Sequence, residues 1–174
     1  MKSKENIVFL GMMGSGKTSI GSLFSKKLNL EFFDIDHQIE NELGMNVSKI
    51  FEKNGESFFR ELEEKITLKI LKKKNIVVSL GGGTFLNKNI RDEILENHVS
   101  FWLNWSSKIL IQRIQDSSKR PIAYKANNKV LIDLIEKRSK IYSKALYKIN
   151  CDNLTKKMVL NKILDIYETK KNNC

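Results

Sequence analysis

Cysteine, proline and arginine are scarce in this chain of 174 residues, and each scarcity limits the classes of protein to which the chain can belong. Two cysteines, Cys151 and Cys174, are too few for a disulfide framework, so we expect both to be free thiols. With one proline and no linker-like stretch, residues 1–174 suit one domain. No apolar run approaches the roughly 18 residues of a membrane span, and nothing resembles a secretory leader. We therefore expect a cytoplasmic chain that contacts no membrane.

The charge of the chain is strongly one-sided, with 31 basic and 20 acidic side chains and a formal net charge of +11. A surplus of this kind is one mark of nucleic-acid-binding proteins. Lysine, isoleucine and asparagine together make up 63 of the 174 residues, however, which indicates a general compositional bias. We attribute most of the lysine surplus to that bias and expect no nucleic-acid partner. An anionic small substrate needs only a few of these charges.

The scarcer residues carry more information. A chain that uses lysine so freely keeps arginine where a flat guanidinium must grip a carboxylate or phosphate with two hydrogen bonds. The five arginines are Arg60, Arg91, Arg113, Arg120 and Arg138. Six of the nine glycines fall in two short loops, at 11–16 and 81–83. These loops are therefore the first candidates for chemistry.

Strand-like and helix-like segments alternate along the chain. Short apolar runs predict strands, and apolar residues three and four apart predict helices. The expected strands are 6–10, 31–35, 75–80, 99–103 and 148–151, and the expected helices are 17–28, 47–51, 57–73, 87–97, 106–115, 129–147 and 154–168. This alternation predicts an α/β fold, a three-layer sandwich with a central five-stranded parallel sheet covered on both faces.

Two segments interrupt the periodic pattern. Residues 116–128 are polar and irregular and contain Pro121, so we expect a long loop or lid there. The lysine- and asparagine-rich tail at 170–174 is expected to be frayed.

Residues 11–18 read GMMGSGKT and match the phosphate-binding loop (P-loop) pattern G-x-x-x-x-G-K-[ST]. The match lies between a predicted strand and a predicted helix, which is the context this motif needs. Its glycines let backbone N–H groups turn toward phosphate oxygens at a helix N-terminus. We expect Lys17 to bridge the β- and γ-phosphates and Thr18 to bind Mg²⁺.

Two carboxylates, Asp34 and Asp36, end the second predicted strand. Strand alternation predicts that both point to the same side, at the carboxyl edge where such sheets bind ligands. One could order the Mg²⁺ shell while the other accepts a proton from an attacking hydroxyl. The alternative is that one of them caps the following helix.

The third predicted strand leads into Gly81, Gly82 and Gly83. Consecutive glycines suit a backbone that closely approaches a ligand, although a structural bend is the alternative. No aspartate follows this strand to hold Mg²⁺, so Asp34 is left for that role. His37 and His98 are too few for a metal cluster, and we expect Trp102 and Trp105 to be packing residues rather than a base-stacking platform.

The motifs occur in a recognisable order. They are the P-loop, Asp34-x-Asp36, Phe59-Arg60-x-x-Glu63, the triple glycine, Arg120-Pro121 and Arg138-x-x-x-Tyr142. Together they resemble the shikimate kinase family, over nearly the whole chain. The resemblance implies a fold like that of P-loop nucleoside-monophosphate kinases. It also implies an enzyme that uses ATP and Mg²⁺ to phosphorylate the 3-hydroxyl of shikimate in aromatic amino-acid biosynthesis. We expect the protein to be a monomer.

The resemblance also implies residue roles. Asp36 would contact the substrate hydroxyls and act as the base, and Lys17 and Arg120, the latter on the lid at 116–128, would complete the catalytic set. The implied ATP contacts are Gly14, Ser15, Gly16, Lys17, Thr18, Ser19, Arg120 and Arg113, with Arg113 over the adenine. The implied shikimate contacts are Asp36, Arg60, Gly81, Gly82, Gly83 and Arg138, and segment 36–64 is the implied substrate-binding helical region. Mg²⁺ would bind Thr18 directly and Asp34 through water. Arg91 has no implied role and is expected at the surface.

Two other readings remain open from the sequence alone. A related small-metabolite kinase, such as a gluconate kinase, or a nucleotide kinase would share the P-loop but would not predict the Arg60 and Arg138 pair around a triple glycine. A P-loop protein that binds a nucleotide or nucleic acid without catalysis would explain the charge and predict salt-dependent retention. The presence of Lys17, Asp36 and Arg120 argues against lost catalysis.

Overall fold

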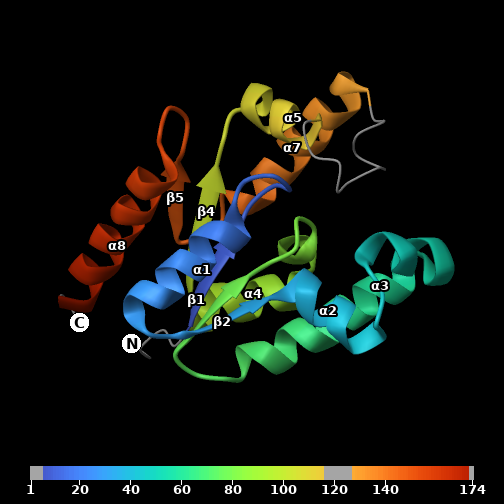
Figure 1. Cartoon of the computed structure of the whole chain (residues 1–174), viewed down its shortest axis with the longest axis horizontal. Coiled ribbons are helices and arrows are strands. Elements are labelled where there is room, and N and C mark those ends of the chain that lie inside the picture. The colour runs from blue at the N-terminus through green and yellow to red at the C-terminus, as the bar shows by residue number, and fades with distance from the viewer. Residues whose placement is uncertain (1–5, 116–126, 173–174) are drawn as a thin grey trace.

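The structure is a computed structural model that describes residues 6–115 and 127–172. Each strand of the described chain is followed by one or more helices (Figure 1). The strands are β1 (Ile7–Leu10), β2 (Glu31–Asp34), β3 (Ile76–Ser79), β4 (Val99–Asn104) and β5 (Tyr147–Asn150). The helices are α1 (Lys17–Leu28), α2 (Ile35–Leu43), α3 (Val47–Leu71), the short 3₁₀ helix η1 (Thr84–Leu86), α4 (Lys88–Asn97), α5 (Ser107–Gln115), α7 (Asn128–Tyr142) and α8 (Lys156–Asn172).

The five strands form one parallel sheet in the order β2-β3-β1-β4-β5. The central strand β1 pairs with β3 on one side and with β4 on the other, so that Val8 lies between Val78 and Ser100. All four residues of β1 are buried. A continuous apolar run is what a strand covered on both faces requires.

A hydrophobic core covers each face of the sheet. Ile7 and Phe9 of β1 pack with α1 and α8, whereas Val8 and Leu10 pack with α3, α4 and α7. This division follows from the alternation of side chains along a strand. Figure 1 shows α8 and α1 on one side of the sheet and α3 and α4 on the other. The predicted α/β class with a five-stranded parallel sheet between helical layers is therefore confirmed.

Several predicted boundaries were wrong. The helix expected at 129–147 ends at Tyr142, because Tyr147 pairs with Phe101 as the first residue of β5. The tail expected to fray from residue 170 continues α8 to Asn172. The predicted division between segments 47–51 and 57–73 agrees with the structure, because the non-helical backbone of Gly55, with φ 82° and ψ 171°, separates two helical parts of α3.

The loops after β1, β2, β3 and β4 all emerge at the carboxyl edge of the sheet. The P-loop, the start of α2, the triple glycine and Trp105 follow these four strands in turn. In open parallel sheets this edge is where ligands bind. Among the described residues, no helix is both long and apolar enough to cross a membrane.

Candidate active site

The P-loop joins β1 to α1 with a backbone that glycine alone accommodates easily. Gly11 has φ 141°, and a Cβ at this position would lie 2.9 Å from the carbonyl oxygen of Leu103. Gly16 has φ 88° and precedes the first residue of α1. Both values lie in the region that side chains rarely adopt. The loop is therefore shaped by the backbone, as the motif predicts.

The Lys17 side chain folds back into the P-loop. Its Nζ donates hydrogen bonds to the carbonyl oxygens of Gly11 and Met12, each at 3.0 Å, and the residue is buried. The ammonium group is thus held against the P-loop, beside the backbone that can bind an anion. Gly14 and Ser15 lie in the same loop, and Thr18 and Ser19 are exposed in the first turn of α1.

Thr18 and Asp34 meet although different elements carry them. The Thr18 hydroxyl donates to Asp34 Oδ2 at 2.6 Å, and Asp34 Oδ1 accepts from the backbone N–H of His37 at 3.3 Å. Asp34 is therefore the N-cap of α2. A hydroxyl beside a carboxylate is a set of hard oxygen donors, which fits Mg²⁺.

Asp36 reaches the site by a different route from the one predicted. The strand ends at Asp34 and Asp36 lies in the first turn of α2, so the expected strand alternation of the two carboxylates is wrong. Its Oδ1 lies against Gly81, 2.5 Å from where a Cβ on that glycine would be. The helix turn, rather than the strand, thus carries this carboxylate to the glycine loop.

Each glycine of the triple glycine adjoins one predicted site residue. Asp36 lies beside Gly81, Arg138 beside Gly82, where a Cβ would be 3.4 Å from Nη1, and Arg60 beside Gly83, where a Cβ would be 2.7 Å from Nη1. A side chain at 81 or 83 would force these groups to shift from their observed positions. The three glycines therefore allow two guanidinium groups and a carboxylate to converge on one short loop.

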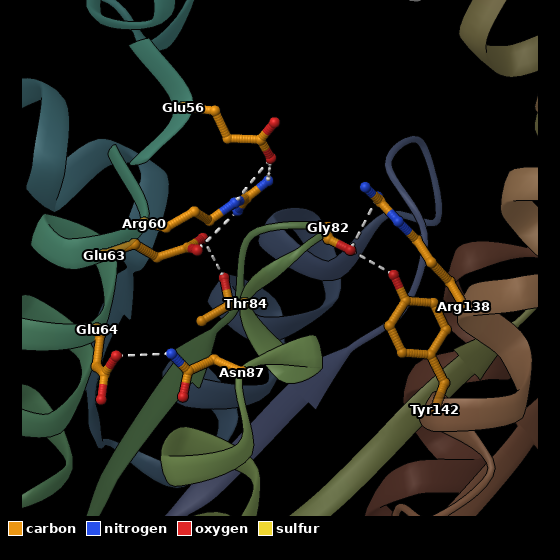
Figure 2. A network of polar contacts seen from close by, with 9 residues as sticks. All are labelled: Glu56, Arg60, Glu63, Glu64, Gly82, Thr84, Asn87, Arg138 and Tyr142. Atoms are coloured by element: carbon orange, nitrogen blue, oxygen red, sulfur yellow. Dashed lines mark hydrogen bonds and ion pairs between the residues drawn. The ribbon is translucent and has the colours of Figure 1, made fainter. Parts of the chain in front are cut away.

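Arg60 is fixed by carboxylates on its own helix (Figure 2). Its Nη1 donates to Glu63 Oε2 at 2.7 Å, and its Nε and Nη2 lie 3.3 Å from Glu56 Oε1. The guanidinium also lies over the ring of Phe59, 5.2 Å from the centroid. Burial tends to lower the pKa of Arg60, but Glu63 and Glu56 outweigh it, so the pKa is raised and the side chain stays charged.

The Glu63 carboxylate is a buried link between α3 and η1. It is 2% exposed, and its Oε1 accepts a 2.6 Å hydrogen bond from the hydroxyl of Thr84, which is fully buried. The neighbouring Glu64 accepts from Asn87 and Asn89, each at 2.7 Å. These bonds, shown in part in Figure 2, fasten the segment after the triple glycine to α3.

The carbonyl oxygen of Gly82 accepts two hydrogen bonds from α7. Arg138 Nη1 donates at 3.1 Å, and the Tyr142 hydroxyl donates to the same oxygen (Figure 2). Burial raises the pKa of Tyr142 to about 12, so its hydroxyl remains a donor throughout the neutral range. The glycine loop is thereby held between α3 on one side and α7 on the other.

Arg113 lies on the P-loop side of the site. Its Nη1 is 3.5 Å from the carbonyl oxygen of Gly14, and the side chain is exposed. Arg120 and most of the expected lid at 116–128 lie outside the described residues. Only the end of that segment is described, where Asn127 caps α7 and Asn128 begins it.

Arg91 is not the surface residue that we expected. It is half-buried, and its Nη1 donates to the carbonyl oxygens of Phe85 at 3.2 Å and Leu86 at 2.9 Å. The guanidinium therefore anchors η1, directly after the triple glycine. The one sequence feature that could have indicated a role for Arg91 is the scarcity of arginine in this lysine-rich chain. That feature applies equally to the other four arginines.

Comparisons with known proteins agree with this geometry. The family model for shikimate kinase matches residues 13–168. The chain is 39% identical over 165 residues to the shikimate kinase of Thermodesulfovibrio yellowstonii, covering 94% of this chain and 95% of that one. It is also 39% identical over 170 residues to the shikimate kinase of Bacillus subtilis, covering 93% and 88%.

Two solved structures have the same architecture. The shikimate kinase of Aquifex aeolicus superposes with a TM-score of 0.85 at 32% identity, covering 95% of this chain and 98% of that one. The shikimate kinase of Acinetobacter baumannii, solved in complex with shikimate, gives a TM-score of 0.89 at 28% identity and covers 98% and 96%.

Proposed function

The chain belongs to the shikimate kinase family, and on that premise we propose how its residues divide the transfer of a phosphoryl group from ATP to shikimate. The activity is that of a kinase of the shikimate pathway. We propose the 3-hydroxyl of shikimate as the acceptor. One observation supports the acceptor site best: Asp36, Arg138 and Arg60 meet three successive glycines.

Arg60 and Arg138 are proposed to hold the shikimate carboxylate. Each presents a planar fork of N–H donors, which suits a carboxylate better than a lysine ammonium does. The two side chains come from α3 and α7 and flank Gly82 and Gly83. Backbone groups of 81–83 would contact the rest of the ring, because no side chains stand between them and the bound molecule.

Asp36 is proposed to accept the proton of the attacking hydroxyl. In the transfer, the shikimate oxygen forms a bond to the γ-phosphorus, the bond from that phosphorus to the β–γ bridging oxygen breaks, and ADP leaves. The proton of the hydroxyl passes to a carboxylate oxygen of Asp36. Phosphoryl transfer requires mainly positioning and charge stabilisation, and the protein supplies both here.

The P-loop is proposed to hold the ATP phosphates. Lys17, at the centre of the loop, would stabilise charge on the transferred phosphoryl group, and Gly14, Ser15, Gly16 and Ser19 would complete the cradle. Thr18 and Asp34 would hold Mg²⁺, which neutralises phosphate charge when it is bound. Arg113 is proposed to lie over the adenine and Arg120 to reach the phosphates from a lid. The monomeric state, the cytoplasmic location and the single domain over 1–174 stay predictions.

The test of the acceptor is ADP production with MgATP and shikimate, with gluconate and nucleoside monophosphates as competing acceptors. We expect ADP production with shikimate and none with gluconate or the nucleoside monophosphates. Turnover with a different acceptor, or none with shikimate, would contradict the proposal.

The proposed base is tested by Asp36→Asn. We expect kcat to fall by about a hundredfold or more, with ATP affinity nearly unchanged, because only proton acceptance is removed. Asp92→Asn is the matched control, since Asp92 is an exposed carboxylate on α4 that pairs with Lys88. Equal losses of kcat and nucleotide affinity in Asp36→Asn would point to misfolding instead.

A further inference from the structure

We infer that Trp105 is a positioning residue of the nucleotide site. The edge of its indole ring holds the P-loop, and the face of the same ring holds Arg113. The sequence favoured a packing role for this tryptophan, and the structure shows two additional polar contacts. The inference rests on the proposed function in one respect, namely that the P-loop binds nucleotide phosphates.

The first contact joins the indole edge to the P-loop. Trp105 Nε1–H donates to the carbonyl oxygen of Ser15 at 3.0 Å, across 90 residues of sequence. The peptide between Ser15 and Gly16 is trans, so its carbonyl and its N–H point in opposite directions. By fixing the carbonyl, Trp105 also fixes the direction of the Gly16 N–H. This N–H lies at the start of α1, where anions bind backbone donors.

The second contact uses the indole face. The Arg113 Cζ lies 3.7 Å from the centroid of the Trp105 ring, which is the stacking distance of a cation–π pair. The Arg113 Nη1 lies 3.5 Å from the Gly14 carbonyl oxygen, so the same guanidinium touches the loop. One face of Arg113 is therefore covered by the indole, while the side chain as a whole remains exposed. A flat cation held in this way is prepared to stack on a planar ligand group.

The position of Trp105 makes it a firm support. It follows the end of β4, is half-buried, and packs against the hydrophobic cores on both faces of the sheet. Leucine or isoleucine could provide this packing, but neither has an N–H donor or an aromatic face. Tryptophan combines all three properties, and each is used here.

The other tryptophan serves as an internal comparison. Trp102 is buried, 5% exposed, and its ring lies 6.0 Å from that of Tyr142, while its Cδ1 lies 3.4 Å from where a Cβ on Gly11 of the P-loop would be. Both tryptophans therefore lie near the P-loop, and the emission of the wild-type protein combines the two. Replacing Trp102 leaves Trp105 as the one fluorescent tryptophan that can report nucleotide binding.

The kinetic test uses two substitutions that remove the contacts stepwise. Trp105→Phe keeps a ring under Arg113 but removes the N–H donor, and Trp105→Leu removes both. We expect the KM for ATP to rise about threefold in the first variant and about tenfold in the second, with kcat and the KM for shikimate within about twofold. A purely structural role would lower the melting temperature and leave both KM values unchanged. That result would overturn the inference, as would an equal rise in both KM values.

A spectroscopic test is independent of turnover and of the Trp105 variants. In Trp102→Phe, Trp105 is the remaining tryptophan, and adding ADP should change its emission, with saturation at the nucleotide Kd. An unchanged emission while ADP binding is measured by calorimetry would overturn the inference. If ADP shifts the Trp105 emission in Trp102→Phe but the wild-type protein does not phosphorylate shikimate, the proposed function fails and the role of Trp105 stands.

Discussion

The nucleotide side of the site comes largely from one short stretch of chain, whereas the acceptor side is assembled from segments far apart in the sequence. The P-loop occupies residues 11–18, and Lys17 binds carbonyl oxygens within that same stretch. On the acceptor side, Gly82 accepts from Arg138, 56 residues further along the chain. The first half is shaped mainly by local backbone geometry, with Trp105 as a distant support, while the second depends throughout on packing of the whole fold.

The two halves also differ in how charge is treated. The P-loop holds the Lys17 ammonium against two backbone carbonyl oxygens, and the backbone N–H groups of such a loop can bind any phosphate. The acceptor side holds its Arg60 with Glu56 and the buried Glu63, and Glu63 in turn with Thr84. Removing one partner of such a network leaves a buried polar group unsatisfied. Acceptor recognition should therefore be sensitive to small side-chain changes that spare nucleotide binding.

Lys17→Ala should give the largest effect and isolates the nucleotide half. We expect kcat to fall by about a thousandfold or more, because the ammonium group stabilises the transferred charge. Shikimate binding, measured by calorimetry, should remain close to wild type. Lys26→Ala, an exposed lysine on the same helix, is the control. A near-normal rate in Lys17→Ala would show that the P-loop assignment is wrong.

Arg60→Lys tests whether the acceptor half can be damaged alone. The charge is kept and the bidentate fork is lost, so we expect the KM for shikimate to rise about ten- to a hundredfold. The KM for ATP should stay within about twofold of wild type. Arg113→Lys is the matched substitution on the other side and should show the reverse pattern. An unchanged shikimate KM in Arg60→Lys would remove this arginine from the acceptor site.

The division between the halves explains what the sequence could predict. The P-loop is encoded by adjacent residues, and its prediction as a glycine-shaped loop between strand and helix agrees with the structure. The parallel sheet followed from alternating strand and helix patterns. The bond from Thr84 to Glu63 and the bond from Trp105 to Ser15 had no local signal, because each joins segments that only the complete fold brings together.

Two errors have local causes. Asp34 ends an edge strand of four residues, too short for alternation to predict where the chain turns into α2. Asp34 caps α2, which was the alternative interpretation of the sequence. Because α2 begins at Ile35, Asp36 lies in this helix rather than in the strand. The helix at 129–147 was predicted too long because the apolar spacing persists into β5, and only pairing with β4 shows where the strand begins.

Thr84→Val sharpens the comparison with a smaller change. Valine keeps the shape but removes the hydrogen bond to the buried Glu63, so we expect about 1 to 3 kcal/mol of lost stability. The KM for shikimate should rise about three- to tenfold, because Glu63 also orients Arg60. Thr84→Ser restores the donor and should recover most of the shikimate KM. A shikimate KM that stays at the wild-type value in Thr84→Val would confine this contact to stability.

Tyr142→Phe should have the smallest effect on turnover at neutral pH, because Arg138 still donates to the Gly82 carbonyl. Its effect on stability depends on pH. Burial raises the pKa of Tyr142 from 10.0 to about 12, so the unfolded chain loses this proton first and the folded state loses stability between those values. The free energy of unfolding of the wild-type protein should fall by about 3 kcal/mol as the pH rises from 10 to 12, and ionisation of Tyr142 should not change it below pH 10.

The phenylalanine variant lacks this titration. At pH 7 it should be less stable than wild type by about 1 kcal/mol, the value of a lost hydrogen bond. Above pH 10 the difference should shrink and then reverse, which denaturant unfolding at a series of pH values would measure. Cys151, in the core on the other face of the sheet, gives a second case, because burial raises the pKa of its thiol from 9.0 to about 12. Cys151→Ala should therefore remove part of the loss of stability with rising pH, beginning near pH 9 rather than pH 10. A constant difference between Tyr142→Phe and wild type from pH 7 to 12 would show that the hydroxyl ionises as freely in the folded protein as in the unfolded chain.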